Sequence, residues 1–278
     1  MGQVPTSDLA SLSPRVTTVQ DFARFKADGR RISVVTAYDA WSARIVARSR
    51  VDAILVGDSV AMVVHGHETT LAATVGLMAS HTRAVARAAT GKFLITDLPF
   101  LSYRRGIPAA ITAVGALVRS GAQAVKLEGV DGHEDVIRQI VGSGVPVMGH
   151  IGLTPQSVHQ FGGFRVQGRG EADATRILRQ AQTLEHLGCF SIVLECIPAE
   201  LAARIRKELT IPTIGIGAGP ETDGQVLVLH DLLGLDQTRT PRFVRRYVDG
   251  EGILTAALDQ YDADVKEARF PDLEESYR

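Results

Sequence analysis

The chain has 278 residues, 45% of them hydrophobic, and its 30 basic and 31 acidic side chains leave a formal net charge of −1. This balance provides no field that would attract nucleic acid or an anionic membrane surface. No run approaches the ~18 apolar residues that a membrane span needs, and the opening segment MGQVPTSDLASLSP lacks the pattern of a secretory signal. We expect one α/β domain over residues 1–278, with 1–16 and 264–278 peripheral.

Short apolar runs of strand length alternate with segments of helical period along the chain. An amphipathic stretch, 19–27, precedes the first run. The eight runs occupy residues 33–37, 52–56, 92–96, 124–127, 146–150, 191–194, 212–216 and 226–229. Segments of helical period include 77–89, 109–121, 134–144, 172–188 and 199–209. This alternation predicts a (βα)8 TIM barrel whose N-terminal helix closes the barrel bottom, with a doubly wound open sheet as the alternative.

Three connections are too long for simple turns between a strand and a helix: 59–74, 99–108 and 151–171. All three follow strands, so we expect them at the mouth of the barrel formed by the carboxyl ends of the strands. Their glycines, in HGH, GGF and QGRG, are typical of ordered loops that fold over a ligand. They are predicted lids.

Four carboxylates, Asp58, Asp97, Glu128 and Glu195, each stand at or just after the end of one of these runs. Active sites of such barrels lie at that mouth, and consecutive strands are neighbours, so the first three acids should be close together. Lys126 lies two residues before Glu128 and therefore on the same face of the strand. A lysine in a barrel strand does not face bulk water, so its amine needs an acidic partner. A purely structural ion pair is the alternative to a catalytic role.

Three like charges in one small region repel strongly unless a cation lies among them. Oxygen ligands without a clustered His or Cys favour Mg²⁺ over zinc or copper, and Mn²⁺ would also fit. A structural calcium site is the weaker alternative, because the chain has no compact D-x-D loop here and a lysine is nearby. We therefore predict one Mg²⁺ per subunit at Asp58, Asp97 and Glu128.

Cys189 and Cys196 lie within and beside one predicted strand, which favours buried cysteines in a reducing compartment and predicts a cytoplasmic protein. Cys196 adjoins Glu195 but has no His beside it, so we do not expect a nucleophile. His65 and His67 resemble a metal pair. They lie in a predicted loop with no third nitrogen ligand near them in sequence, so we expect them to be exposed or hydrogen-bonded.

A series of motifs from about residue 33 to 247 resembles the successive signatures of ketopantoate hydroxymethyltransferase, also called 3-methyl-2-oxobutanoate hydroxymethyltransferase. The motifs are VVTAYDA, ILVGDSVAMVVHGHETT, TDLPFLSY, AVKLEG, PVMGHIGLTPQSV, GGFRVQGR, VLECIP, IPTIGIGAG and DGQVLVLHDLLG. The resemblance implies a Mg²⁺-binding (βα)8 barrel that transfers a hydroxymethyl group from 5,10-methylenetetrahydrofolate to C3 of α-ketoisovalerate. The product, ketopantoate, leads to pantothenate and coenzyme A. A homo-oligomer, often a decamer, is also implied.

The resemblance assigns roles residue by residue. The family's metal-associated acids fall on Asp58, Asp97 and Glu128, the last acting more through water than by direct ligation. The proton-transferring carboxylate falls on Glu195. The positions that hold or adjoin the keto acid fall on a set of polar residues: Asp58, Ser59, Asp97, Lys126 and His150. This set suits removal of the weakly acidic C3 proton, because Mg²⁺ and Lys126 stabilise the charge of the enolate as it forms.

The chain departs from the family pattern at three positions. Many relatives carry an aromatic residue and an acid where His67 and Glu68 stand, and a smaller or phenolic residue at Trp41. The departures concern folate contacts, lid packing, a subunit contact or the mouth, and remove no catalytic group.

Two other functions remain open. One is a Mg²⁺-dependent 2-oxo acid lyase or mutase of the phosphoenolpyruvate mutase and isocitrate lyase type, whose members usually carry a reactive Cys on a flexible loop. The other is a non-catalytic metabolite-binding barrel. The lack of such a loop Cys argues against the first, and an intact set of Lys126, Glu128 and Glu195 argues against the second.

Overall fold

The computed structural model describes residues 18–236 and 241–277. The chain forms two compact units, one that ends at Leu227 and one that starts at Val228. The predicted peripheral position of residues 1–16 lies outside the described residues. The assignment of the whole chain to one domain remains a prediction.

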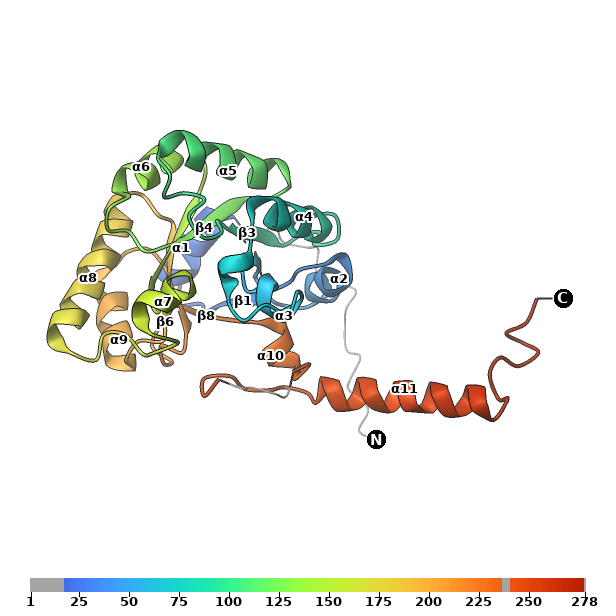
Figure 1. The fold of residues 1–278 in the computed structure, drawn as a ribbon. Helices are drawn as coiled ribbons and strands as arrows, with labels where there is room; N and C mark the ends of the chain where they lie inside the picture. The colour runs from blue at the N-terminus through green and yellow to red at the C-terminus, as the bar shows by residue number, and fades with distance from the viewer. Residues whose placement is uncertain (1–17, 237–240, 278) are drawn as a thin grey trace. The chain divides into compact units, whose positions relative to one another are not determined.

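Eight parallel strands close into a barrel in chain order, with β1 paired to β8 (Figure 1). The strands are β1 (Ile32–Thr36), β2 (Ala53–Val56), β3 (Phe93–Asp97), β4 (Ala124–Glu128), β5 (Val147–Gly152), β6 (Ser191–Glu195), β7 (Thr213–Ile216) and β8 (Gly224–Leu227). Each is largely buried because helices cover its outer side and side chains fill the interior. The barrel prediction is confirmed, and the open doubly wound sheet is wrong.

The predicted strands match the observed ones to within about two residues at each end, as is usual for element boundaries. The last strand differs most. β8 begins at Gly224, ahead of the apolar run that starts at Val226. Gly224 aligns with Ile32 of β1 and Ile214 of β7, and a Cβ added to it would lie 2.3 Å from the carbonyl oxygen of Ile32. The close approach of these backbones therefore requires glycine there.

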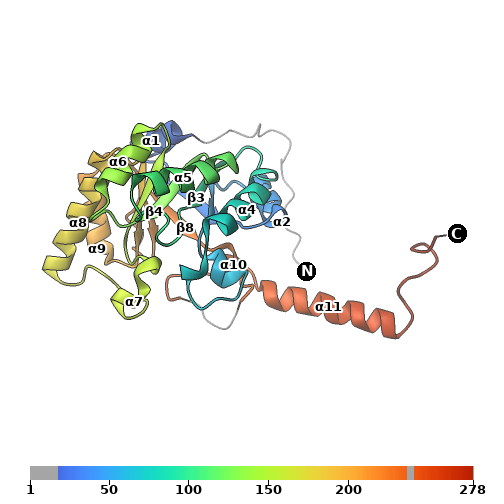
Figure 2. The ribbon, with the colours of Figure 1, turned by 45° about the horizontal axis from the view of Figure 1, so that its top comes forward.

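Helices on the outside of the barrel confirm the predicted segments of helical period (Figure 2). They are α4 (Val75–Ala86), α5 (Ile107–Arg119), α6 (Glu134–Gly142), α8 (Glu171–His186) and α9 (Ala199–Glu208). The sequence analysis does not predict α2 (Ala40–Arg48), which begins after Asp39, whose side chain accepts a hydrogen bond from the backbone N–H of Ser42. Short helices interrupt two of the predicted lids: α3 (Val60–Val63), η1 (Thr70–Ala72), η2 (Pro155–Ser157) and α7 (Val158–Phe161).

The N-terminal helix α1 (Val19–Ala27) closes the barrel bottom, as predicted. Its first turn is a capping box in which the side chains of Thr18 and Asp21 each accept from the other residue's backbone N–H. Phe22 and Phe25 are buried. They join a cluster of inward residues drawn largely from the first positions of the strands: Ile32, Val34, Ala53, Leu55, Phe93, Ile95, Ala124, Met148, Val193, Ile214 and Val226.

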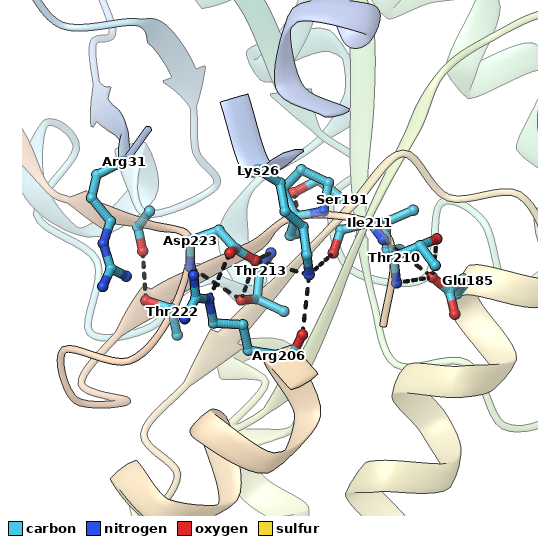
Figure 3. Close-up of polar contacts among 12 residues, drawn as sticks. Lys26, Arg31, Glu185, Ser191, Arg206, Thr210, Ile211, Thr213, Thr222 and Asp223 are labelled. Carbon is cyan, nitrogen blue, oxygen red and sulfur yellow. Dashed lines mark hydrogen bonds and ion pairs between the residues drawn. The ribbon is translucent and has the colours of Figure 1, made fainter. Parts of the chain in front are cut away.

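A polar network fastens the end of α1 to the turn before β8 (Figure 3). Nζ of Lys26 lies 3.1 Å from Oδ2 of Asp223 and donates to the carbonyl oxygens of Arg206 and Ile211. Asp223, only 2% exposed, also accepts hydrogen bonds from Arg206 at 2.7 Å and from the backbone N–H of Thr213 at 2.9 Å. Buried charges are tolerated when paired in this way, so this end of the barrel is structural.

The second unit contains α10 (Leu229–Leu233) and α11 (Gly250–Lys266). The tail expected from residue 264 therefore begins inside α11. At helical spacing α11 presents Leu254, Leu258, Tyr261 and Val265, which are 45% to 68% exposed. Among the described residues, no helix is long and apolar enough to span a membrane.

Candidate active site

The strand ends bring the four predicted acids to one mouth of the barrel. Asp97, Glu128 and Glu195 are the last residues of β3, β4 and β6, and Asp58 follows β2 by two residues. All parallel strands end at the same rim, where barrel enzymes place their active sites. Asp58, Asp97 and Glu128 are each at most 4% exposed. Such buried acids need compensating charges or protons.

Lys126 supplies one of these charges. It lies in β4 in register with Asp97 of β3, and its Nζ is 2.7 Å from Oδ1 of Asp97. Burial alone would lower the pKa of Lys126, but the negative charges of Asp97, Glu128 and Asp58 outweigh burial and raise it. Lys126 is therefore a cation at neutral pH.

His150 of β5 lies between Lys126 and Glu195. Its Nδ1 is 3.4 Å from Nζ of Lys126 and 3.6 Å from Oε1 of Glu128, and its Nε2 is 3.2 Å from Oε2 of Glu195. Burial and then the charge of Lys126 lower the pKa of His150 well below its ordinary value, so the ring is neutral. Because an ammonium can only donate, Nδ1 accepts from Lys126 and the ring hydrogen is on Nε2. Nε2 forms no hydrogen bond with the described residues, although Oε2 of Glu195 is close to it.

The acids of the mouth are unusually weak. Burial raises the pKa of Glu195 from 4.5 to about 8, although the charge of Lys126 opposes the rise. Burial also raises the pKa of Asp58 to about 7, with a further contribution from Asp97. For Glu128, burial and then Asp58 raise the pKa well above its ordinary value. Carboxyl groups tuned toward neutral pH are suited to proton transfer.

Gln156 is a site residue that the sequence analysis missed. Its side-chain amide donates to Oδ2 of Asp58 at 2.8 Å, and its backbone N–H donates to Oε2 of Glu128 at 2.9 Å. Tyr103 donates to Oε1 of Gln156 at 3.2 Å, which orients the amide. Gln156 lies in the quoted motif GHIGLTPQSV. A glutamine in a predicted loop carries no signal, however, that its side chain reaches an acid 98 residues away in the chain.

Ser59, predicted to hold the keto acid, lies beside this cluster at the start of α3. Its Oγ is 2.7 Å from the hydroxyl oxygen of Tyr38, a buried residue just after β1 that the sequence analysis also missed. Asp58 donates its backbone N–H to Oδ2 of Asp97 at 3.0 Å. Every residue predicted for the site is therefore at the mouth, around Lys126 and His150.

The ketopantoate hydroxymethyltransferase family model matches residues 16–273. The chain belongs to this family. The 3-methyl-2-oxobutanoate hydroxymethyltransferase of Bdellovibrio bacteriovorus is 54% identical over 260 residues, which cover 94% of this chain and 99% of the relative. The protein of the same name from Coxiella burnetii (strain RSA 493 / Nine Mile phase I) is 51% identical over 255 residues, which cover 91% and 96%. The chain is thus a hydroxymethyltransferase.

Solved structures of more distant proteins share the barrel of this hydroxymethyltransferase. A phosphonopyruvate hydrolase in complex with oxalate and Mg²⁺ matches with a TM-score of 0.62 at 11% identity over 92% of each chain. A 2,3-dimethylmalate lyase of the PEP mutase/isocitrate lyase superfamily matches with a TM-score of 0.57 at 17% identity over 94% of this chain and 91% of that one. At such identities the likeness establishes the fold alone.

The acids of this family member are suitable ligands for a divalent cation, although they do not form a complete set of protein ligands. Within residues 18–236 and 241–277, no three His, Cys, Asp or Glu side chains are grouped so that they could hold a metal ion. Mg²⁺ is usually bound by one or two carboxylates together with water and substrate oxygens. The carboxylates of Asp58, Asp97 and Glu128 offer oxygen atoms near Lys126, and the backbone N–H of Asp58 donates to Oδ2 of Asp97. Burial is the main cause of the raised pKa values of Asp58 and Glu128, and a neighbouring carboxylate adds to each. This donor set fits Mg²⁺.

The cysteines of the hydroxymethyltransferase are not activated. Cys189 is buried and Cys196 is partly buried, and both are free thiols. Burial raises the pKa of each to about 12, with Glu195 adding to the rise at Cys196. A nucleophilic cysteine needs the opposite shift, which supports the prediction that neither is a nucleophile.

His65, His67 and Glu68 lie in the first long connection, 59–74, and Trp41 lies on α2. Nε2 of His65 is 2.9 Å from Nε2 of His81, whose Nδ1 is 2.5 Å from the carbonyl oxygen of Tyr38. His65 therefore hydrogen-bonds to a helix residue rather than pairing with His67. His67 and Glu68 are exposed, and Trp41 on α2 is 55% exposed. None of these side chains approaches the acids through a hydrogen bond or ion pair that the structure shows.

Proposed function

We propose that this enzyme transfers a hydroxymethyl group from 5,10-methylenetetrahydrofolate to C3 of α-ketoisovalerate, giving ketopantoate for pantothenate and coenzyme A synthesis. Family membership supports the reaction. The single observation that carries it within the structure is the arrangement of Lys126, His150 and Glu195, a cation and a weak carboxyl group on either side of a neutral imidazole. That arrangement suits removal of a proton next to a carbonyl group.

Different residues of the chain contact different parts of the keto acid. Lys126 places positive charge where the keto oxygen gains negative charge. Ser59, whose hydroxyl is shared with Tyr38, is positioned to donate to the substrate carboxylate. Mg²⁺, one per subunit and held by Asp58 and Asp97 with Glu128 close by, would supply Lewis-acid polarisation of the keto acid. Asp58 and Asp97 then position the keto acid as well.

Glu195 is the base in this proposal. Its side chain is 16% exposed at the mouth and burial raises its pKa to about 8, so its ionised form is a stronger base than an ordinary glutamate. Nε2 of His150 lies 3.2 Å from Oε2 of Glu195, so the imidazole borders the base, while the charge of Lys126 favours the ionised form of Glu195. The transfer also consumes one water molecule, which supplies the oxygen of the new hydroxyl group and one hydrogen to the folate. As the C–N bonds to the one-carbon unit break and the new C–C bond forms, Glu195 returns the proton taken from C3 to the other folate nitrogen.

The proposal extends to the setting of the enzyme. We place it in the cytoplasm, where reducing conditions suit free Cys189 and Cys196. We also propose a homo-oligomer, most simply the decamer implied by the family resemblance. The exposed apolar residues of α11 support self-association.

The test is exchange of the C3 hydrogen of α-ketoisovalerate for deuterium, followed by NMR in the presence of Mg²⁺ and the absence of folate. Wild-type enzyme should catalyse this exchange. Glu195→Gln keeps the shape of the side chain but removes the base, so both exchange and turnover should fall by about 10²–10⁴-fold, while binding of the keto acid persists.

The matched control is Glu200→Gln, a neutralised acid five residues further along the chain in the first turn of α9. It should exchange at the wild-type rate. Folded wild-type protein that binds Mg²⁺ and α-ketoisovalerate but shows no exchange would contradict the proposed function. Loss of keto acid binding in Glu195→Gln would instead show that Glu195 binds substrate rather than moving a proton.

A further inference from the structure

We infer that two adjoining cavities beside the acids bind the folate co-substrate, with the pterin head in the larger and the aminobenzoyl ring in the smaller. This inference rests on the proposed function. The larger cavity measures about 470 Å³ and the smaller about 220 Å³. They share Arg104, Ser157 and Gln160 in their linings, so they adjoin. Cavities of this size commonly take cofactors.

The larger cavity reaches the reacting end of the barrel. Its lining includes Gly129, directly after Glu128, and Gly152, which is in register with Glu195. Gly152 has a φ of +94°, and a Cβ there would lie 2.3 Å from the backbone oxygen of Glu195. Only glycine permits this approach. Only the backbone at Gly152 therefore separates a ligand in this cavity from Glu195, the proposed base.

The wall away from the acids offers polar groups in a matching pattern. Gln180 of α8 is 7% exposed, and its Nε2 donates to Oδ2 of Asp131 at 2.6 Å. Gln160 and the ring of Phe161, both on α7, complete this side. A pterin carries alternating donors and acceptors along its edge and a flat heterocyclic face. Amide and carboxylate groups beside an aromatic ring can satisfy both features.

The smaller cavity is apolar where the larger is polar. Leu71, Phe100 and Leu101 line it, and Gln156 lies in its lining while covering Asp58 and Glu128. A benzoyl ring buries apolar surface against such a wall. In this placement the N5 and N10 atoms of the folate, which carry the one-carbon unit, lie at the junction next to Gln156.

Arg104 adds positive charge at that junction. Its guanidinium donates to the carbonyl oxygen of Glu128 at 2.9 Å and lies 5.5 Å from the ring centroid of Tyr103. Among the described residues, no carboxylate forms an ion pair with Arg104, whereas Arg176 of the larger cavity is paired with Asp173. The unmatched charge of Arg104 favours an anionic ligand such as a folate.

The test is calorimetric binding of tetrahydrofolate, which carries no one-carbon unit, to the Mg²⁺-loaded enzyme. Gln180→Leu preserves side-chain size and removes the buried amide, so tetrahydrofolate should bind about tenfold more weakly. Phe100→Ser should weaken binding of the fragment p-aminobenzoylglutamate, while Gln180→Leu should weaken binding of the fragment tetrahydropterin. The matched control is Gln182→Leu, on the same helix, whose exposed amide donates to Glu208 outside the cavity.

The deuterium exchange of α-ketoisovalerate needs no folate and reports whether each variant is folded. Exchange by Gln180→Leu and Phe100→Ser should stay within about twofold of wild type, because neither side chain hydrogen-bonds to the four acids of the mouth, Asp58, Asp97, Glu128 and Glu195. Unchanged tetrahydrofolate affinity in both variants would overturn the inference. Wild-type protein that binds tetrahydrofolate in these cavities but does not exchange deuterium would instead overturn the proposed reaction and leave the folate site standing.

Discussion

Gln156 controls two of the acids at the mouth with two N–H groups. Its side-chain amide stabilises the ionised form of Asp58, and its backbone N–H does the same for Glu128. A hydrogen bond to a charged group contributes about 1.5–3 kcal/mol. The amide therefore keeps Asp58 available as an anion despite its burial.

Replacing the amide tests this role. Gln156→Leu removes the donor, so the pKa of Asp58 rises further and protons compete with the cation. Mn²⁺ binding, followed by electron paramagnetic resonance, should weaken by about tenfold at pH 7 and by much less at pH 9. Gln139→Leu, which removes an exposed amide on α6, is the control. Tighter Mn²⁺ binding in Gln156→Leu would show that the amide competes with the cation.

The pKa of Glu195 predicts how the exchange rate depends on pH. A base acts in its ionised form, so the rate rises with pH through its pKa. Lys126 lowers the pKa of Glu195 and Asp97 raises it, while burial has the largest effect. Added Mg²⁺ lowers it in turn, so kcat/KM for exchange should rise along one limb with a midpoint between 4.5 and about 8.

A rate that is independent of pH over this interval would contradict the assignment of Glu195 as the base. Glu195→Gln provides the control, since its residual exchange rate should no longer rise with pH over this interval.

Sequence reasoning predicted the acids and Lys126 because each follows or lies in an apolar strand whose period fixes the side that it faces. His150 was predicted only through the family resemblance. Sequence reasoning missed Gln156 and Tyr38 for a physical reason. Both act through contacts between segments far apart in the chain, 98 residues in the case of Gln156 and Asp58. No local pattern encodes such contacts, and a loop sequence does not specify where its side chains point.

Among the elements, α1 has the clearest structural task. Phe22 is fully buried at the barrel bottom, and its ring lies 5.6 Å from that of Phe93 and 5.3 Å from that of Phe190. Phe22→Ala should lower the free energy of unfolding by about 3–5 kcal/mol, as measured by denaturant titration. Phe164→Ala, at an exposed loop position, should change it by less than about 0.5 kcal/mol. Similar losses in the two variants would mean that α1 does not close the core.

Helices show where element prediction succeeds and fails. The segments that became α5, α6 and α8 have clear apolar faces, which the barrel buries. α2 escaped because the face that it buries carries the small side chains of Ser42 and Ala43, while its largest apolar side chains, Trp41 and Ile45, are exposed. Tertiary packing, rather than sequence period, stabilises such a short helix.

For the whole molecule, the exposed stripe on α11 suggests how copies of the chain associate. Contiguous exposed apolar residues commonly mark association surfaces. The double variant Leu254→Glu with Leu258→Glu should shift the protein to smaller species in sedimentation velocity. Ala256→Glu adds charge on the opposite face of α11 and is the control. A monomeric wild-type protein, or an assembly that the double variant leaves intact, would contradict the proposed role of α11.

The closure of the barrel bottom by α1 also constrains the order of folding. α1 is translated before every strand, yet the cluster that receives Phe22 and Phe25 includes Val226 of β8, the last strand. During synthesis, the buried cluster around Phe22 and Phe25 therefore stays incomplete until nearly 200 further residues have been added to the chain. We expect a nascent chain that stalls before β8 to leave Phe22 and Phe25 incompletely buried, a state that favours aggregation.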